Sequence, residues 1–80
     1  MIKVWRIRKY CGKAGGSNYY YHADVIAPHW QTALKAANDE RVKNWRWIDT
    51  YDSTDEDYCY YEYLYQVSDN PRKPATPMEI

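Results

Sequence analysis

Hydrophobic and polar residues alternate along four segments of the chain, which is the pattern of strands with one buried face. These segments are residues 2–10, 19–27, 45–51 and 58–67. The stretch 11–18, which holds all three glycines, separates the first two, and the polar stretch 52–57 separates the last two. Such residues form the turns between neighbouring antiparallel strands. The pattern therefore predicts two β-hairpins.

One segment between the hairpins has the periodicity of a helix. Its apolar positions, at offsets of three, four and seven from the first, are Trp30, Ala33, Leu34 and Ala37. This is the spacing of a helix with one buried stripe. Pro28 suits the start of the helix, and Arg41 takes the next apolar position, so the helix should end near residues 40–43. We expect Trp30 to pack on tyrosine and tryptophan rings of the sheet.

The order strand, strand, helix, strand, strand predicts an α+β fold, with a single helix packed on one face of a four-stranded antiparallel sheet. Residues 1–68 form this single domain. Three prolines follow within residues 69–80, at Pro71, Pro74 and Pro77. This segment is predicted to be a mobile tail with nothing to pair with.

Side chains that alternate along a strand point to opposite faces of the sheet, so parity assigns each strand residue to a face. The face under the helix is predicted to carry Trp5, Ile7, Tyr21, Ala23, Val25, Trp45, Trp47, Cys59, Tyr61, Tyr63, Tyr65 and Val67. The opposite face is predicted to carry Val4, Arg6, Arg8, Tyr20, His22, Asp24, Arg46, Ile48, Tyr58, Tyr60, Glu62 and Leu64. Because the pattern offers no second helix to cover it, we expect this second face to be open.

The aromatic content changes what the core can be made of. The chain has 10 Tyr, 4 Trp and no Phe. Each of these rings buries about 150–250 Å², so aromatic residues can supply a core that aliphatic residues alone would leave too small. A small core cannot hide ten phenols, and we expect several of them to face solvent or a partner.

The charges balance in number but not in position. Lys and Arg number 11, as do Asp and Glu, which argues against a strongly basic nucleic-acid binder and against an acidic mimic of DNA. Residues 1–13 contain basic side chains and no acid, at Lys3, Arg6, Arg8, Lys9 and Lys13. Residues 49–62 contain acids and no base, at Asp49, Asp52, Asp55, Glu56, Asp57 and Glu62. Either adjacent strands complement each other, or the molecule has a bipolar docking surface whose acidic tip steers it to a basic groove.

No motif predicts catalysis, a metal site or a cofactor, and we expect the chain not to be an enzyme. The glycine-rich stretch leads into a strand, whereas a phosphate-binding loop leads into a helix. The acidic stretch lacks the spacing of a calcium-binding EF-hand. His22 and His29 have no ligand or catalytic partner at a recognisable spacing.

The two cysteines leave an alternative open. Cys11 and Cys59 are neighbours if the first and last strands pair antiparallel. The N-terminal residues lack the apolar region of a secretion signal, and no apolar run reaches the roughly 18–20 residues of a membrane span. We therefore expect a cytoplasmic protein and favour free thiols over a disulfide.

The segment Val25-Ile26-Ala27 leads directly into the alanine-rich helix His29–Ala37. Together with the element order and the size of the chain, this segment resembles small phage-encoded inhibitors, namely anti-CRISPR proteins and phage inhibitors of host RNA polymerase. The likeness covers about residues 19–51 and concerns architecture, so it assigns no functional residue. It implies a binding protein that occludes a surface of a host or defence nucleoprotein complex, such as a CRISPR effector, in the host cytoplasm.

Tyrosine and arginine are enriched at protein interfaces because they combine large contact area with a polar end. The predicted partner-binding residues are Arg6, Arg8, Tyr20, Arg46, Asp55, Glu56, Asp57, Tyr58 and Tyr60. The alternative is a module for single-stranded nucleic acid, in which the same rings stack on bases. The zero net charge, with Asp24 and Glu62 on the same face, argues against that alternative.

Overall fold

The computed structural model describes residues 3–53, 56–67 and 76–80. Within these residues the elements are β1 (Val4–Gly12), β2 (Ser17–Ile26), α1 (Trp30–Asn38), β3 (Arg46–Ser53), β4 (Tyr58–Val67) and β5 (Met78–Glu79). The α+β class, the single helix and the first hairpin, β1 with β2, are confirmed in this described part. The second predicted hairpin is wrong, because β3 pairs with β2 and β4 pairs with β1, which places β3 and β4 at opposite ends of the strand order. The sheet has the strand order β3-β2-β1-β4, and each of these neighbours is antiparallel.

The helix ends earlier than its apolar pattern predicts. Glu40 has a positive φ of 60°, and the amides of Glu40 and Arg41 donate to the carbonyl oxygens of Ala37 and Ala36. These bonds form a Schellman motif, in which a residue in the left-handed conformation satisfies the last carbonyls of the helix. The helix therefore ends at Asn38, and the predicted end near residues 40–43 is wrong by two residues or more.

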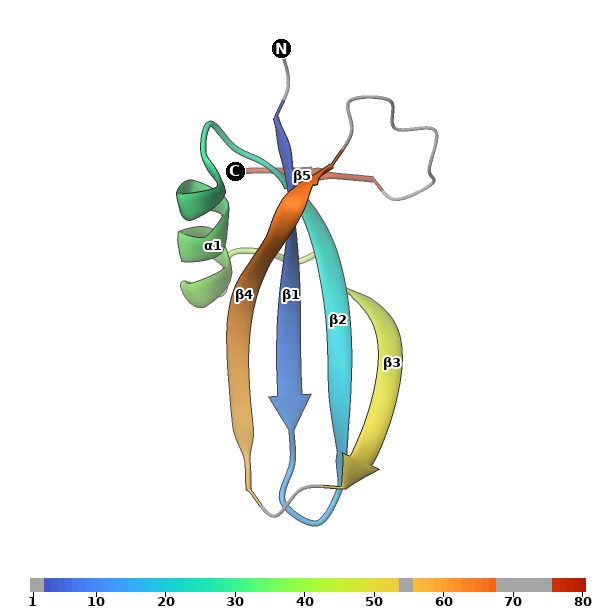
Figure 1. Ribbon diagram of the computed structural model, residues 1–80. Helices are drawn as coiled ribbons and strands as arrows, with labels where there is room; N and C mark the ends of the chain where they lie inside the picture. Colours follow the sequence, from blue (N-terminus) through green and yellow to red (C-terminus); the bar gives the residue numbers. More distant parts are fainter. Residues whose placement is uncertain (1–2, 54–55, 68–75) are drawn as a thin grey trace.

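The helix packs on β1 and β4, on one face of the sheet (Figure 1). Its buried residues are Ala33, Ala36 and Ala37, whose small side chains let the helix approach the strands closely. The sheet contributes Trp5, Ile7, Ala23 and Val25 to the same core, as predicted. Trp5 is fixed further by its indole Nε1, which donates to the carbonyl oxygen of Ala27 at 2.8 Å.

Trp30 packs on an aromatic ring of the sheet, as predicted, but it does not enter the core. Its ring stacks on Tyr63 with centroids 4.9 Å apart, while 38% of the residue stays exposed. Trp30 is the first residue of α1 and so lies at the end of the helix, where solvent reaches one side of the ring.

A β-bulge at Leu64 overturns part of the predicted face assignment. Opposite β1, Arg6 pairs with Tyr65 and Ile7 pairs with Tyr63, so Leu64 has no partner. An extra residue of this kind reverses the facing of every later residue in the strand. Tyr61 and Tyr63 lie under the helix as predicted, whereas Tyr65 and Val67 share the open face with Arg6 and Val4, and their assignment to the helix face is wrong.

Trp47 is also wrongly assigned to the covered core. It pairs with Tyr21 on β2, but it is 60% exposed. The physical reason is the strand order, because α1 lies over β1 and β4 while β3 is at the other edge of the sheet. Nothing in the described chain covers Trp47, and its indole Nε1 donates to Thr50 Oγ1 at 3.0 Å.

The C-terminal residues do find a partner. β5 pairs in parallel with β2, with Met78 opposite Val25, and Met78 packs against the core. The side-chain Nδ2 of Asn44 links this segment to the sheet by donating to the backbone carbonyl oxygens of Asp24 and Thr76. The expectation of an unpaired tail over 69–80 is therefore wrong for residues 76–80, and residues 69–75 lie outside the described part of the chain.

Cys11 and Cys59 form a disulfide, so the preference for free thiols is wrong. β1 and β4 pair antiparallel and place these two residues directly opposite each other, with Cα atoms 4.2 Å apart. Among the described residues no helix has the length and apolar character needed to cross a membrane.

Candidate functional site

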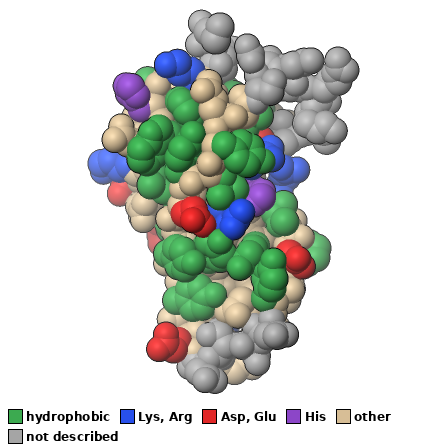
Figure 2. Space-filling view, viewed as in Figure 1, with side chains coloured by type: hydrophobic (Ala, Val, Ile, Leu, Met, Phe, Trp, Pro, Cys, Tyr) green, Lys and Arg blue, Asp and Glu red, His purple; other side chains and the backbone are tan. Residues whose placement is uncertain are grey.

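The open face of the sheet carries a row of five tyrosines that crosses all four long strands. In order across the sheet this tyrosine row consists of Tyr51 on β3, Tyr20 on β2, Tyr10 on β1, and Tyr60 and Tyr58 on β4. The centroid distances between successive rings are 4.4, 4.3, 4.6 and 5.9 Å. Figure 2 shows this face, where hydrophobic side chains gather over the strands with acidic and basic groups between them.

The strand register explains the row. Tyr10 is the direct cross-strand partner of Tyr20 on one side and of Tyr60 on the other. Directly opposed side chains on one face of a sheet lie close enough to interact, and each aromatic pair is worth about 0.5–1.5 kcal/mol beyond its buried area. The rings therefore hold one another in place, and only Tyr51 and Tyr60 are classed as exposed, at 48% and 50%.

Arg8 lies at the centre of the row. Its guanidinium lies over the rings of Tyr10 and Tyr20, 5.4 and 5.6 Å from their centroids, and Nη1 donates to the Tyr10 hydroxyl at 2.5 Å. Burial lowers the pKa of Arg8, but the hydrogen bond to Tyr10 and the nearby Tyr10 and Glu62 outweigh it and raise the pKa. Arg8 therefore keeps its charge and fixes the orientation of two rings of the row.

Two phenols of the row, Tyr20 and Tyr60, stay neutral at physiological pH. Loss of water around Tyr20 and Tyr60 raises the pKa of each hydroxyl, and the neighbouring Tyr10 raises it further. A neutral hydroxyl both donates and accepts a hydrogen bond. The row therefore offers apolar ring surface with donors and acceptors at its edge.

A second group lies beside the row, nearer the helix end of the sheet. Arg6 binds Asp24 through two hydrogen bonds of 2.8 and 3.0 Å, and its Nη1 donates to the Tyr65 hydroxyl at 2.9 Å. Asp24 is 5% exposed. The hydrogen bond to Asp24 raises the pKa of Arg6 against the opposing effect of burial, so this pair is a fixed and internally neutral part of the face.

His22 is flanked by arginines from both neighbouring strands. It pairs with Arg8 on β1 and with Arg46 on β3. Burial lowers the pKa of His22 first, and the positive charges of Arg8, Arg6 and Arg46 lower it further. The imidazole is therefore neutral at physiological pH.

The charges on the open face balance. On β1 to β4 the strand register places three arginines there, at positions 6, 8 and 46, and three acids, at positions 24, 49 and 62. With His22 neutral, these residues of the four long strands together carry no net charge. Its chemistry is that of aromatic area with paired ions, which is the composition of a protein interface more than of a phosphate-binding surface.

The structure brings six of the nine predicted partner-binding residues onto this one face: Arg6, Arg8, Tyr20, Arg46, Tyr58 and Tyr60. Glu56 and Asp57 are exposed just before β4, where Asp57 Oδ1 accepts a hydrogen bond of 2.6 Å from the backbone amide of Ala14. Asp55 lies outside the described residues. The expected exposure is confirmed for Tyr60, whereas Arg6, Arg8, Tyr20 and Tyr58 are half-buried because they pack on one another.

Three tyrosines of the face, Tyr10, Tyr51 and Tyr65, were not predicted to bind. Tyr10 has the same parity as Arg6 and Arg8, so the alternation contained the signal for it. Tyr51 and Tyr65 have the parity of the helix face, and only the bulges at Ile48 and Leu64 bring them to the open side. The sequence pattern therefore could not place Tyr51 and Tyr65 on the open face.

Comparison of the chain with protein-family models, with curated proteins and with solved structures gives no match. No three His, Cys, Asp or Glu side chains of the described segments lie where they could jointly hold a metal ion. The interpretation of the site therefore depends on the geometry of the open face.

Proposed function

We propose that this chain is a binding protein, not an enzyme, that docks the open face of its sheet on another protein. The observation that supports this most directly is the tyrosine row, a continuous and preorganised aromatic surface that no described segment covers. Fixed aromatic side chains lose little conformational freedom on binding. An interface built on them therefore gains affinity from contact area without a large entropic cost.

The balance of charge favours a protein partner over nucleic acid. Binding to single strands depends on a positive groove along the phosphates, with ring faces free for the bases. Here three acids offset the three arginines, and Tyr10 already stacks on Tyr60 and meets Tyr20 edge to face. The single-stranded nucleic-acid alternative is therefore the weaker of the two.

We propose further that docking inhibits the partner by covering a surface of it. The molecule measures 44 × 25 × 18 Å, so its broad face is large enough for a standard interface, which buries about 800 Å² on each side. The exposed acids Glu56 and Asp57 lie next to the Tyr58 end of the row. An acidic tip in that place suits a basic groove, the kind of surface with which a host or defence nucleoprotein complex, a CRISPR effector among them, holds its nucleic acid.

Site-specific photo-crosslinking tests this proposal. A photoreactive amino acid replaces Tyr60 on the open face in one variant and Tyr19, a comparably exposed tyrosine on the opposite face, in a matched control. Each variant is expressed in host cells and irradiated, with and without nuclease treatment. We expect discrete protein adducts from position 60 that survive nuclease, and few from position 19.

Two outcomes would contradict the proposal. Equal adducts from positions 60 and 19 would show that the open face has no special role. Crosslinking of position 60 to nucleic acid would favour the nucleic-acid module. So would tight binding of a short single-stranded oligonucleotide by the wild-type protein at physiological salt.

The cytoplasmic location stays a prediction, and the disulfide bears on it. Disulfides persist in oxidising compartments and are rare in a reducing cytoplasm. Alkylation of the protein in intact cells, before lysis, would show whether Cys11 and Cys59 are thiols in their native compartment. We expect thiols if the protein works in the cytoplasm.

A further inference from the structure

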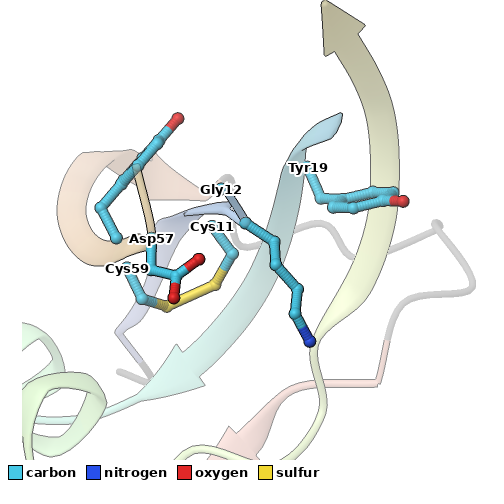
Figure 3. A pocket seen from close by; sticks show the side chains of 7 residues that line it. Cys11, Gly12, Tyr19, Asp57 and Cys59 are labelled. Carbon is cyan, nitrogen blue, oxygen red and sulfur yellow. A yellow bond between two sulfur atoms is a disulfide. The ribbon is translucent and has the colours of Figure 1, made fainter. Parts of the chain in front are cut away.

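The disulfide lies on the wall of an open cleft at the end of the sheet where β1 turns into β2 (Figure 3). Cys11, Cys59 and Tyr19 line it from the face opposite the tyrosine row, and Tyr58, the end of the row, borders it. The cleft has a volume of about 480 Å³. Its lining residues are Cys11, Gly12, Lys13, Tyr19, Asp57, Tyr58 and Cys59. In the close-up the disulfide faces this space, with the Asp57 carboxylate beside it and Tyr19 across from it on β2. Molecules the size of a small peptide can enter a cleft of this volume.

The two sulfur atoms are not equally accessible. Cys59 is exposed, whereas Cys11 is half-buried. Disulfides that solvent reaches exchange with free thiols much more readily than those enclosed in a core. The accessible end of this disulfide is therefore Cys59.

We propose that this cleft is a thiol-exchange site, at which a small-molecule thiol such as glutathione opens the Cys11–Cys59 bond in the folded protein. The thiolate sulfur forms a bond to Cys59 Sγ while the bond between the two cysteines breaks, and the electron pair leaves on Cys11 Sγ as a thiolate. A second thiol then attacks the mixed disulfide and frees Cys59. The two small thiols leave as their own disulfide, and water protonates the cysteine thiolates, so the protein is reduced as the small thiols are oxidised.

The charges in the cleft set which thiols react fastest. Lys13 lines the same space and favours both an incoming anion and the departing Cys11 thiolate, because a nearby cation stabilises a thiolate. Asp57, which immediately precedes β4, also lines the cleft and repels an anion. Removing the charge of Lys13 should therefore slow exchange with an anionic thiol, and removing the charge of Asp57 should speed it.

Opening the disulfide should affect the tyrosine row. Cys11 follows Tyr10 and Cys59 precedes Tyr60, so the disulfide joins β1 to β4 one residue from the stacked pair that carries the row between these strands. Once the link is broken, this end of the two strands is held only by hydrogen bonds and ring contacts. The exchange site is thus placed to loosen the open face from the opposite side of the sheet.

The rate at which the full oxidised chain is reduced, followed in quenched samples, tests the proposal. Glutathione is added over a range of concentrations, samples are quenched with an alkylating reagent, and peptide mass mapping locates each modification. We expect a rate that rises linearly with thiol concentration, and an intermediate with glutathione on Cys59 and the alkyl group on Cys11. Near-ultraviolet circular dichroism of the tyrosines should change together with the reduction.

Three substitutions sharpen the test, each measured with anionic glutathione and with cationic cysteamine. Relative to the rate with cysteamine, Asp57→Asn should speed exchange with glutathione about threefold, and Lys13→Gln should slow it by a similar factor. Glu56→Gln is the control, because Glu56 is an adjacent acid that is not among the described residues lining the cleft. It should change either rate less than Asp57→Asn does.

Several results would overturn the proposal. A rate that levels off at the rate of global unfolding, whatever the thiol concentration, would show that the folded protein is not attacked. Glutathione found mainly on Cys11 would place the attack at the wrong sulfur. Charge variants that leave the ratio of the glutathione rate to the cysteamine rate unchanged would remove the cleft from the reaction.

Discussion

Tyr10 on β1 stacks on Tyr60 on β4, with ring centroids 4.6 Å apart and ring planes inclined by 22°. On its other side Tyr10 meets Tyr20 edge to face at 4.3 Å. Tyr10 is therefore the central ring of the row, and it joins β1 to both of its neighbours, β2 and β4, on the uncovered side of the sheet. The same contacts that stabilise the fold thus position the surface that we propose to be functional.

Replacing the central ring should cost more stability than its position on an open face suggests. Tyr10→Ala removes two ring pairs and the hydroxyl that accepts from Arg8, so we expect a loss of about 2–3 kcal/mol in the free energy of unfolding. Tyr19→Ala is the control, since no ring contact of Tyr19 is found in the described part of the chain, and it should cost less than about 1 kcal/mol. Urea unfolding followed by circular dichroism measures both, and equal losses would mean that the row contributes nothing to stability.

The paired ions of the open face should differ in their effect on stability. Asp24→Ala leaves the half-buried Arg6 without its carboxylate, and we expect a loss of about 2–3 kcal/mol. Glu62→Ala removes a side chain that is 43% exposed and whose Oε1 lies 3.9 Å from Arg8 Nη1. This change should cost less than about 1 kcal/mol. Thermal melts at fixed ionic strength compare the two variants, and a larger loss for Glu62→Ala would refute the assignment of Asp24 as the buried partner.

His22 should make stability depend on pH. Burial and the neighbouring arginines hold its pKa in the folded state below the unfolded value, which is about 6.5. The unfolded chain therefore takes up a proton first as the pH falls, so stability is complete above about pH 6.5 and declines as the pH falls toward the lower folded pKa.

Urea unfolding of wild type and His22→Gln from about pH 7.5 to about pH 5 isolates this contribution. The stability of wild type should fall more steeply than that of the variant, because glutamine takes up no proton. Parallel pH profiles would show that His22 titrates alike in the two states.

The C-terminal strand should matter for stability although its sequence resembles a loose tail. Met78 packs on the core and pairs with Val25, so Met78→Ala should cost about 1–2 kcal/mol. Glu79→Ala alters the exposed neighbour in the same strand and should change stability by less than about 0.5 kcal/mol. Deleting residues 76–80 should lower the melting temperature by several degrees, and an unchanged melting temperature would mean that β5 contributes nothing.

Alternation and helical spacing were sufficient to predict the element order, the helix face and the core residues Trp5, Ile7, Ala23 and Val25. They failed at Leu64 and Ile48, where single-residue bulges shift the register. A bulge depends on how two distant strands fit together, so neither strand's own pattern contains it. The place of Met78 was missed for a related reason, because it depends on which strands become neighbours in space. The Cys11–Cys59 disulfide was one of the two alternatives, and free thiols were preferred only because the chain shows no secretion signal.

The same bulges explain why only part of the binding face was predicted. Arg6, Arg8, Tyr20, Arg46, Tyr58 and Tyr60 come before any bulge or lie in strands where parity holds, and they reach the open side as expected. Tyr51 and Tyr65 reach the open face only because the two bulges shift the register before them. The continuity of the tyrosine row across four strands requires the strand order β3-β2-β1-β4, which local sequence does not specify.

The central claim is that the open face binds a protein, and the dissociation constant of the captured complex tests it most directly. Purified partner is titrated with wild type, with Tyr60→Ala and with Tyr19→Ala, after circular dichroism has shown that all three are folded. We predict that Tyr60→Ala weakens binding about thirtyfold, equivalent to about 2 kcal/mol, and that Tyr19→Ala changes it by less than about threefold. Equal affinities for wild type and Tyr60→Ala, with a large loss for Tyr19→Ala, would place the interface on the opposite face of the sheet and contradict the account.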